Sequence, residues 1–188
     1  GSSCSHRGLT AALAAALAAP ANGDDLAALQ RDWPTAGAVW DIWAADDEPA
    51  LTAFLWRIAA EESGDEKARQ EVGHPIHDAN VYLTANLRKR LWEEEGVRGY
   101  RFVQRAGEAV FIPAGCPHQV YNIRSSIKVA EDFVSPEHIT RCLKLTEQFR
   151  ALPLSHRRKQ DTLGVKDIML HAISYFLSVS VEEEDEDE

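Results

Sequence analysis

Apolar residues recur at the three- to four-residue spacing of a buried helix face in several parts of the chain. The first helix is predicted over 51–58, and Pro49 precedes it where a first helical turn tolerates proline. Thr84 is a residue type that caps helix starts, and the apolar stripe that follows it stops at Gly96. Two further helices are predicted over 135–152 and 162–179.

From residue 100 the spacing changes to the alternation that is typical of strands. Four short segments, separated by glycine, proline and serine, are predicted as strands: 100–104, 108–112, 118–123 and 127–133. Closely spaced strands of this kind indicate a meander in a sandwich or barrel. The tract 37–43, which contains two tryptophans, suits a buried turn that enters a helix. The pattern as a whole predicts a mixed α+β fold.

Residues 1–35 are rich in alanine, glycine and aspartate, and they predict a variable insertion or linker with a short helix over 9–19. No apolar run approaches the ~20 residues that a membrane span needs. The stretch 9–19 also lacks the basic start of a signal peptide. The cysteines, Cys4, Cys116 and Cys142, are odd in number and widely spaced. They argue for a reducing, intracellular setting and against a disulfide framework or structural zinc site.

Charge is concentrated at the C-terminal end. The formal net charge is −10, and the acidic run 182–188 supplies most of it. A like-charge run of this length is typical of a solvated, disordered tail, which we predict over 181–188; contact with basic partners such as histones is the alternative. The basic cluster 157–159 is too short to predict nucleic-acid binding.

The segment 107–122 carries the chemistry. It fits the second cupin motif, G-x5-P-x-G-x2-H-x3-N, at every fixed position. Its prolines and glycines predict a sharp turn, after which a strand begins at His118. Because side chains alternate along a strand, His118, Val120 and Asn122 are expected on one face and Gln119 on the other. The His118 imidazole can then bind a metal, whereas Asn122 lies about 13 Å further along and is interpreted as lining.

Other candidates have simpler interpretations. His74, His77 and Asp78 form a cluster that can bind a metal, but hydrogen bonding within a loop is the preferred interpretation. Cys116 precedes His118 by two positions, and a small residue in a tight turn explains it. Lys128 can meet an acidic co-substrate or face solvent, and we favour solvent. The tryptophan positions 40, 43 and 56 and the pair 91–92 are interpreted as core.

Several tracts resemble the Jumonji-C (JmjC) demethylases that act on histone H3 lysine 9. They are 37–43, 74–78, 87–97, 110–120, 127–138 and 145–150, and the resemblance extends over about 36–178. It implies a partial double-stranded β-helix, the JmjC jelly roll, with flanking helices and a C-terminal helical pair. The predicted organisation is an insertion over 1–35, the C-terminal part of a JmjC domain over 36–150, a helix over 151–180 and a tail over 181–188.

The resemblance also implies cofactors and partners. Enzymes of this family bind Fe(II) through two histidines and a carboxylate and use 2-oxoglutarate to oxidise N-methyl groups of lysine. His118 matches the third metal ligand of the family. The implied partners are the histone H3 tail in chromatin and the N-terminal half of the domain, and the implied location is the nucleus.

The first two ligands of the family come as H-x-D or H-x-E. None of the seven histidines of this chain is followed two positions later by aspartate or glutamate. One histidine cannot hold a catalytic iron, so we expect this chain alone to be inactive. Three hypotheses stay open: a part of an active demethylase, a non-catalytic chromatin scaffold, or a small cupin protein that uses His118 with other ligands.

Overall fold

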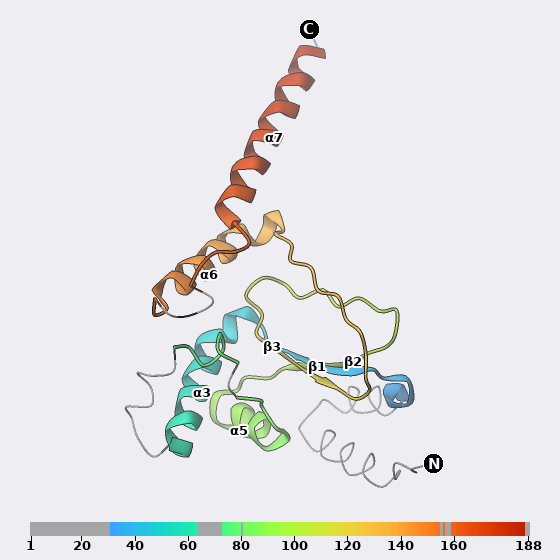
Figure 1. Ribbon diagram of the computed structural model, residues 1–188, viewed down its shortest axis with the longest axis vertical. Coiled ribbons are helices and arrows are strands. Elements are labelled where there is room, and N and C mark those ends of the chain that lie inside the picture. The colour runs from blue at the N-terminus through green and yellow to red at the C-terminus, as the bar shows by residue number, and fades with distance from the viewer. Residues whose placement is uncertain (1–30, 64–72, 80, 155, 157–158, 187–188) are drawn as a thin grey trace. The chain divides into compact units, whose positions relative to one another are not determined.

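The computed structural model describes residues 31–63, 73–79, 81–154, 156 and 159–186 (Figure 1). These residues fall into two compact units, and each unit is described by itself. The first holds the described residues up to Ile112 together with Cys116–Lys128, and the second holds Pro113–Gly115 and the residues from Val129 onward. The predicted insertion helix over 9–19 lies outside the described residues.

A three-stranded antiparallel sheet organises the first unit. Strand β1 (Ala38–Ile42) lies between β2 (Tyr100–Gln104) and β3 (His118–Asn122). Ile42 of β1 is paired with both Tyr100 and His118, and Trp40 is paired with both Phe102 and Val120. The predictions of strands over 100–104 and 118–123 are confirmed, and the mixed α+β class is confirmed with them.

Three strand-level predictions were wrong. The tract 37–43 is not a turn that enters a helix, because it forms β1, the middle strand, which pairs on both edges. The segments 108–112 and 127–133 are not strands in the described structure. A strand exists only through its hydrogen-bonded neighbour, and these two segments have the composition of strands without a described partner. Their apolar side chains are correspondingly exposed, with Phe111 at 78% and Ile127 at 99%.

Two helices pack beside the sheet and enclose the main core. Helix α3 (Glu48–Ser63) and helix α5 (Ala85–Glu95) confirm the predicted helices in these regions. The hydroxyl of Thr84 accepts a hydrogen bond from the backbone N–H of Leu87, and Gly96 ends α5 in the left-handed conformation. The core consists of Trp43, Leu51, Phe54, Leu55, Ile58, Leu83, Leu91 and Val97. Of the residues expected in the core, Trp92 is instead 45% exposed.

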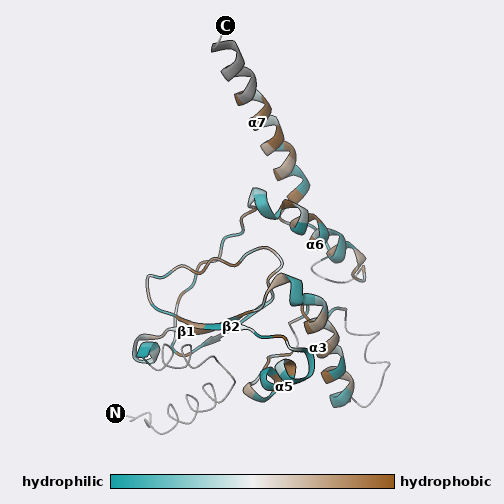
Figure 2. Cartoon of the chain, turned by 180° about the vertical axis from the view of Figure 1, so that it is seen from behind, coloured by the Kyte–Doolittle hydropathy of each residue, from teal (hydrophilic) through white to brown (hydrophobic). Residues whose placement is uncertain are grey.

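The second unit is helical. A 3-10 turn, η3 (Pro136–His138), leads into α6 (Ile139–Ala151), so the helix predicted from Ser135 starts with a tighter turn. The Lys159 ammonium donates hydrogen bonds to the carbonyl of Arg150 in the last turn of α6, at 2.8 Å, and to that of Leu152 just after the helix, at 2.7 Å. Helix α7 (Val165–Glu186) carries many apolar residues (Figure 2) and includes most of the acidic run that the sequence predicts to be disordered.

None of the helices in the described part of the chain is long and apolar enough to cross a membrane.

Candidate functional site

The predicted metal ligand stands at the first position of β3, as the motif requires. The turn before it is tied to the end of β1, because the backbone N–H of Trp43 donates to the carbonyl of Pro117 at 2.9 Å. The His118 side chain is exposed, and its Nδ1 lies 3.2 Å from the carbonyl oxygen of Cys116. A carbonyl only accepts, so Nδ1 carries the proton in the neutral ring, and Nε2 presents a lone pair that can bind a metal.

An aromatic row continues from His118 across the sheet. The ring of Trp40 stacks with that of His118, with centroids 5.8 Å apart and an interplanar angle of 25°. It also stacks with Phe102, at 6.4 Å and 8°. The Trp40 Nε1–H donates to Oε1 of Gln104 at 2.9 Å, which fixes the ring edge. Trp40, expected in the core, is therefore only partly buried and forms a platform beside the candidate ligand.

Lys128 reaches the same face of the sheet. Its ammonium donates a 2.8 Å hydrogen bond to Oδ1 of Asn122 and lies 5.5 Å from the centroid of the Trp40 ring. Asn122 was expected on the His118 face, and the strand register supports this, since His118, Val120 and Asn122 pair with alternate residues of β1. Lys128 is exposed, as predicted, but it is held in place rather than extended into solvent.

The opposite face of the sheet holds a charged cluster that the sequence analysis missed. Asp41 is 2% exposed, and its two carboxylate oxygens accept bonds from Nε and Nη2 of Arg101 at 2.6 and 2.8 Å. Gln119 donates from Nε2 to Asp41 at 2.9 Å. Arg88 lies 3.8 Å from the same carboxylate, and its burial lowers its pKa, an effect that Asp41 opposes. The sequence signal for this cluster was Asp41, a charged residue inside the apolar tract 37–43. If the tract is a strand, the alternation of its side chains places Asp41 on one face of the sheet.

Gln119 also anchors the chain segment that precedes α5. Its Oε1 accepts from the backbone N–H of Leu83 at 2.8 Å, and its Nε2 donates to the Leu83 carbonyl at 2.9 Å. The neighbouring Tyr82 lies near this cluster and is 43% exposed. Burial, followed by the charge of Asp41, raises the pKa of the Tyr82 phenol. Gln119, which follows the candidate ligand His118, is thus hydrogen-bonded to two separate parts of the unit, β1 and the segment before α5.

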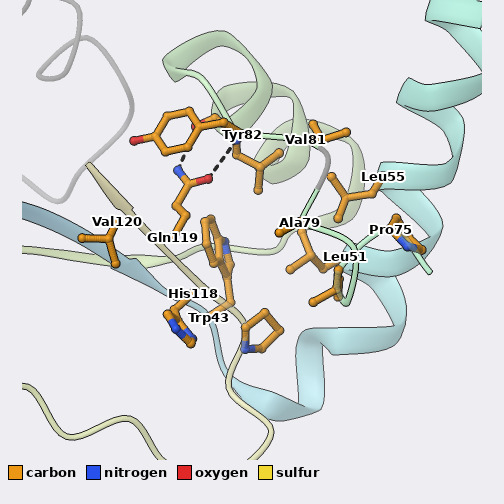
Figure 3. Close-up of a pocket in the computed structure, with 13 residues that line it drawn as sticks. Trp43, Leu51, Leu55, Pro75, Ala79, Val81, Tyr82, His118, Gln119 and Val120 are labelled. Atoms are coloured by element: carbon orange, nitrogen blue, oxygen red, sulfur yellow. Dashed lines mark hydrogen bonds between the residues drawn. The ribbon is translucent and has the colours of Figure 1, made fainter. Parts of the chain in front are cut away.

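A pocket of about 330 Å³ opens between β3, α3 and the segments 75–79 and 81–83 (Figure 3). Its walls are mainly apolar, and polar groups come from Tyr82, His118 and Gln119. Figure 3 shows Gln119 reaching toward Tyr82 on one side of Trp43, while His118 lies on the other side. The remaining lining residues are Leu51, Leu55, Pro75, Ile76, Ala79, Val81, Leu83, Pro117 and Val120.

The histidine cluster at 74–78 forms a hydrogen-bonded turn, as its preferred interpretation predicted. Asp78 accepts from the backbone N–H of His74 at 2.8 Å, and the backbone N–H of Asp78 donates to the His74 carbonyl at 2.9 Å. The rings of His74 and His77 stack with centroids 4.1 Å apart. The structure brings this turn to the pocket wall through Pro75 and Ile76.

The described residues do not complete a metal site by themselves. Within the part of the chain that the structure describes, no group of three His, Cys, Asp or Glu side chains could hold a metal ion. His118 contributes one imidazole nitrogen, whereas a non-haem iron site of the two-histidine, one-carboxylate type needs three protein ligands. The arrangement supplies one prepared ligand, an aromatic wall and an ammonium on one sheet face.

Comparison with known proteins identifies a family for this region. The family described as "JmjC domain, hydroxylase" matches residues 29–133, which include all three strands and the segment around His118.

Individual relatives are similar over a longer part of the chain. Lysine-specific demethylase 3A of Mus musculus is 49% identical over 137 residues, which are 73% of this chain and 10% of that protein. Lysine-specific demethylase 3 of Drosophila melanogaster is 51% identical over 138 residues, 73% of this chain and 16% of the relative. Lysine-specific demethylase JMJ26 of Arabidopsis thaliana is 46% identical over 144 residues, which are 76% of this chain and 16% of that relative. The chain therefore spans about a tenth to a sixth of the relatives it matches.

Proposed function

The chain belongs to the JmjC domain family, and from this premise we propose that it is the C-terminal part of the catalytic domain of a histone lysine demethylase. The similarity to lysine-specific demethylases of three organisms supports this proposal. The substrate we propose is a methylated lysine of the histone H3 tail, of the lysine-9 type, in the nucleus. The fold we propose is the second half of the JmjC jelly roll, a partial double-stranded β-helix.

The orientation of His118 is the observation that carries the proposal. Its Nδ1 is engaged by the Cys116 carbonyl, which leaves Nε2 for a metal. The Trp40 ring and the turn at Pro117 hold the imidazole at the start of β3. A hydrogen-bonded second nitrogen is the usual support of a metal-binding histidine, so His118 has the surroundings of a third iron ligand.

Two further ligands have to come from a segment with an H-x-D or H-x-E pair. Strand β3 is the outer strand at one edge of the described sheet. One side of β3 pairs with β1, and no strand of the described residues pairs with its other side. Side chains of a strand added to the open edge would lie about 5 Å from those of β3, close enough to share a metal with His118. In this family Fe(II) and 2-oxoglutarate supply the oxidising chemistry, and by itself this chain is expected to be inactive.

The test compares this chain with a longer polypeptide of the same protein that includes an H-x-D or H-x-E segment. Each is supplied with Fe(II), 2-oxoglutarate and a histone H3 peptide methylated at lysine 9, and formaldehyde release is measured. We expect release from the longer polypeptide, none from this chain, and none from the longer polypeptide with His118→Ala. Equal release by the His118→Ala variant would overturn the proposal.

The alternative function is a non-catalytic chromatin scaffold. The observation that favours it is the absence of an H-x-D or H-x-E sequence anywhere in the 188 residues. It predicts that the full-length protein also lacks such a pair and still binds histone H3 peptides with Fe(II) removed by chelation. A pull-down with and without chelator, beside the formaldehyde assay, separates the two functions.

A further inference from the structure

We propose that Gln119 is a positioning residue for the metal ligand: anchored on Asp41, it holds the backbone of His118 from the opposite face of the sheet and so fixes where the imidazole points. The inference deepens the proposed function and rests on it for the role of His118. Gln119 acts through the backbone, because neighbouring side chains of β3 lie on opposite faces of the sheet.

The side-chain amide of Gln119 is bound through all of its polar groups. Its Nε2 donates to Oδ2 of Asp41 and to the carbonyl of Leu83, each at 2.9 Å, and its Oε1 accepts from the backbone N–H of Leu83 at 2.8 Å. A primary amide has two N–H donors and one carbonyl oxygen, and each of them is used here. A glutamate at this position would have no donor and would set a second carboxylate against Asp41. The site therefore requires a side chain that both donates and accepts.

The anchor of Gln119 is itself held by two arginines. Asp41 is paired in register with Gln119, and its two carboxylate oxygens accept from Arg101 at 2.6 and 2.8 Å. Arg88 of α5 lies 3.8 Å from the same carboxylate and donates from Nη1 to the carbonyl of Leu83 at 2.7 Å. The contacts therefore close into a ring that ties β1, β3 and the start of α5 together. Two-point pairing of a carboxylate with a guanidinium is strong and directional, so the ring offers β3 a rigid support.

The imidazole of the ligand has weaker support than its backbone. His118 is exposed, and its ring is held by the 3.2 Å contact of Nδ1 with the Cys116 carbonyl and by the stack on Trp40. Because Gln119 is the next residue of β3, a shift of the strand at that point moves the imidazole with it. A metal site tolerates deviations of about 0.2 Å in its ligand distances. Loss of the Gln119 bonds is therefore expected to lower the affinity for the metal.

Cobalt binding by the longer polypeptide, the one that includes an H-x-D or H-x-E segment, tests the inference. Co²⁺ binds the same imidazole and carboxylate ligands, and its visible absorption gives the dissociation constant by titration. Gln119→Met removes the three hydrogen bonds and keeps the length of the side chain. The first control, Leu91→Ala, removes a buried core side chain of α5 and lowers stability, but it leaves the groups that bond Gln119 unchanged. The second control, Gln148→Met, makes the same exchange at an exposed position of α6.

We expect Gln119→Met to raise the dissociation constant for Co²⁺ about tenfold, the scale of lost support around a metal ligand. Leu91→Ala and Gln148→Met should bind Co²⁺ as the wild type does. Unchanged affinity in Gln119→Met, or an equal loss in Leu91→Ala, would overturn the inference. If Gln119→Met does not fold, Arg88→Met opens the same ring on α5 and should also weaken Co²⁺ binding. Unchanged affinity in that variant would overturn the inference as well.

A metal-free measurement separates this inference from the demethylase. In the 188-residue chain, the ring carbon shifts of His118, measured by NMR, should move toward those of a free histidine in Gln119→Met and stay unchanged in Leu91→Ala. Such a movement beside an inactive longer polypeptide would keep the positioning role and refute the demethylase. An active polypeptide whose Co²⁺ affinity and His118 shifts are unchanged in Gln119→Met would do the reverse.

Discussion

The amide of Gln119 donates to the buried carboxylate of Asp41 at 2.9 Å, and this bond joins the residue after His118 to the middle strand of the sheet. Since the same amide also bonds both backbone groups of Leu83, Gln119 connects β3, β1 and the start of α5. The backbone that carries the candidate metal ligand is thus fixed from the face opposite the imidazole. Removing either partner should loosen that backbone.

Asp41→Ala is expected to be strongly destabilising. It would leave Arg101, whose side chain is 8% exposed, and the partly buried Arg88 without their carboxylate. Breaking a buried ion pair from one side costs about 3–5 kcal/mol. Urea unfolding followed by circular dichroism measures the loss, with Asp132→Ala, an exposed carboxylate, as the control. A free energy of unfolding within error of that control would refute the structural role of the cluster.

Gln119→Ala should lower the free energy of unfolding less than Asp41→Ala does, because it leaves fewer groups without a partner. It leaves the backbone N–H of Leu83 without its acceptor, and an unsatisfied partly buried donor costs about 1–3 kcal/mol. We expect faster amide hydrogen exchange at Leu83 than in the wild type, measured by mass spectrometry. Gln104→Ala, which removes the acceptor of the Trp40 indole, is the matched amide control and should leave exchange at Leu83 unchanged.

Acid should weaken the contact between α3 and α5. Hydrogen bonds from Arg90 lower the pKa of Glu61 and Glu94 below the ordinary 4.5. A carboxylate with a lowered folded-state pKa contributes stability that is complete above the unfolded value and lost as the pH falls through the folded one. We therefore expect the midpoint of urea unfolding to decrease as the pH drops below about 4.5. The decrease should be less steep in Arg90→Gln than in the wild type. Parallel pH profiles would contradict this.

The sequence predicted the helices and the functional strand well because their signals are local. Thr84 and Gly96 determine the ends of α5 through their own side-chain and backbone chemistry, and the proline–glycine turn determines where β3 begins. The tract 37–43 was misassigned because a strand that pairs on both edges depends on distant neighbours. Its apolar run lacks the simple alternation that marks a strand with one wet face.

In the candidate site, too, the sequence predicted the local features and missed the contacts between distant residues. His118 and Asn122 were found from the motif spacing, since alternation alone places them on one face. The contact of Lys128 with Trp40 joins residues 88 positions apart, and that of Gln119 with Asp41 joins residues 78 apart. No local pattern encodes such contacts. The contact of Gln119 with Asp41 follows from the register of β1 with β3, in which these two residues are paired.

The tautomer of His118 gives a direct test of its preparation for a metal. Because Nδ1 faces the Cys116 carbonyl at 3.2 Å, we expect the proton of the neutral ring on Nδ1. Long-range proton–nitrogen NMR correlations at pH 8 distinguish the two tautomers, and His118→Ala identifies the resonances. A free histidine prefers the proton on the other nitrogen, and that form at His118 would contradict the arrangement. Zn²⁺ or Co²⁺ added to the longer polypeptide should then shift Nε2 rather than Nδ1.

The segment around Ile127 and Val129, which pairs with no strand among the described residues, predicts self-association of the isolated chain. These side chains are 99% and 85% exposed and alternate as on a strand, a pattern that favours pairing with another copy. We expect Ile127→Thr with Val129→Thr to lower the weight-average mass in sedimentation velocity without changing the urea midpoint, because neither side chain contributes to the core. The control pair, Ser125→Thr with Ser126→Thr, should leave association unchanged. A wild-type chain that stays monomeric at tens of micromolar would refute this and favour the self-contained scaffold.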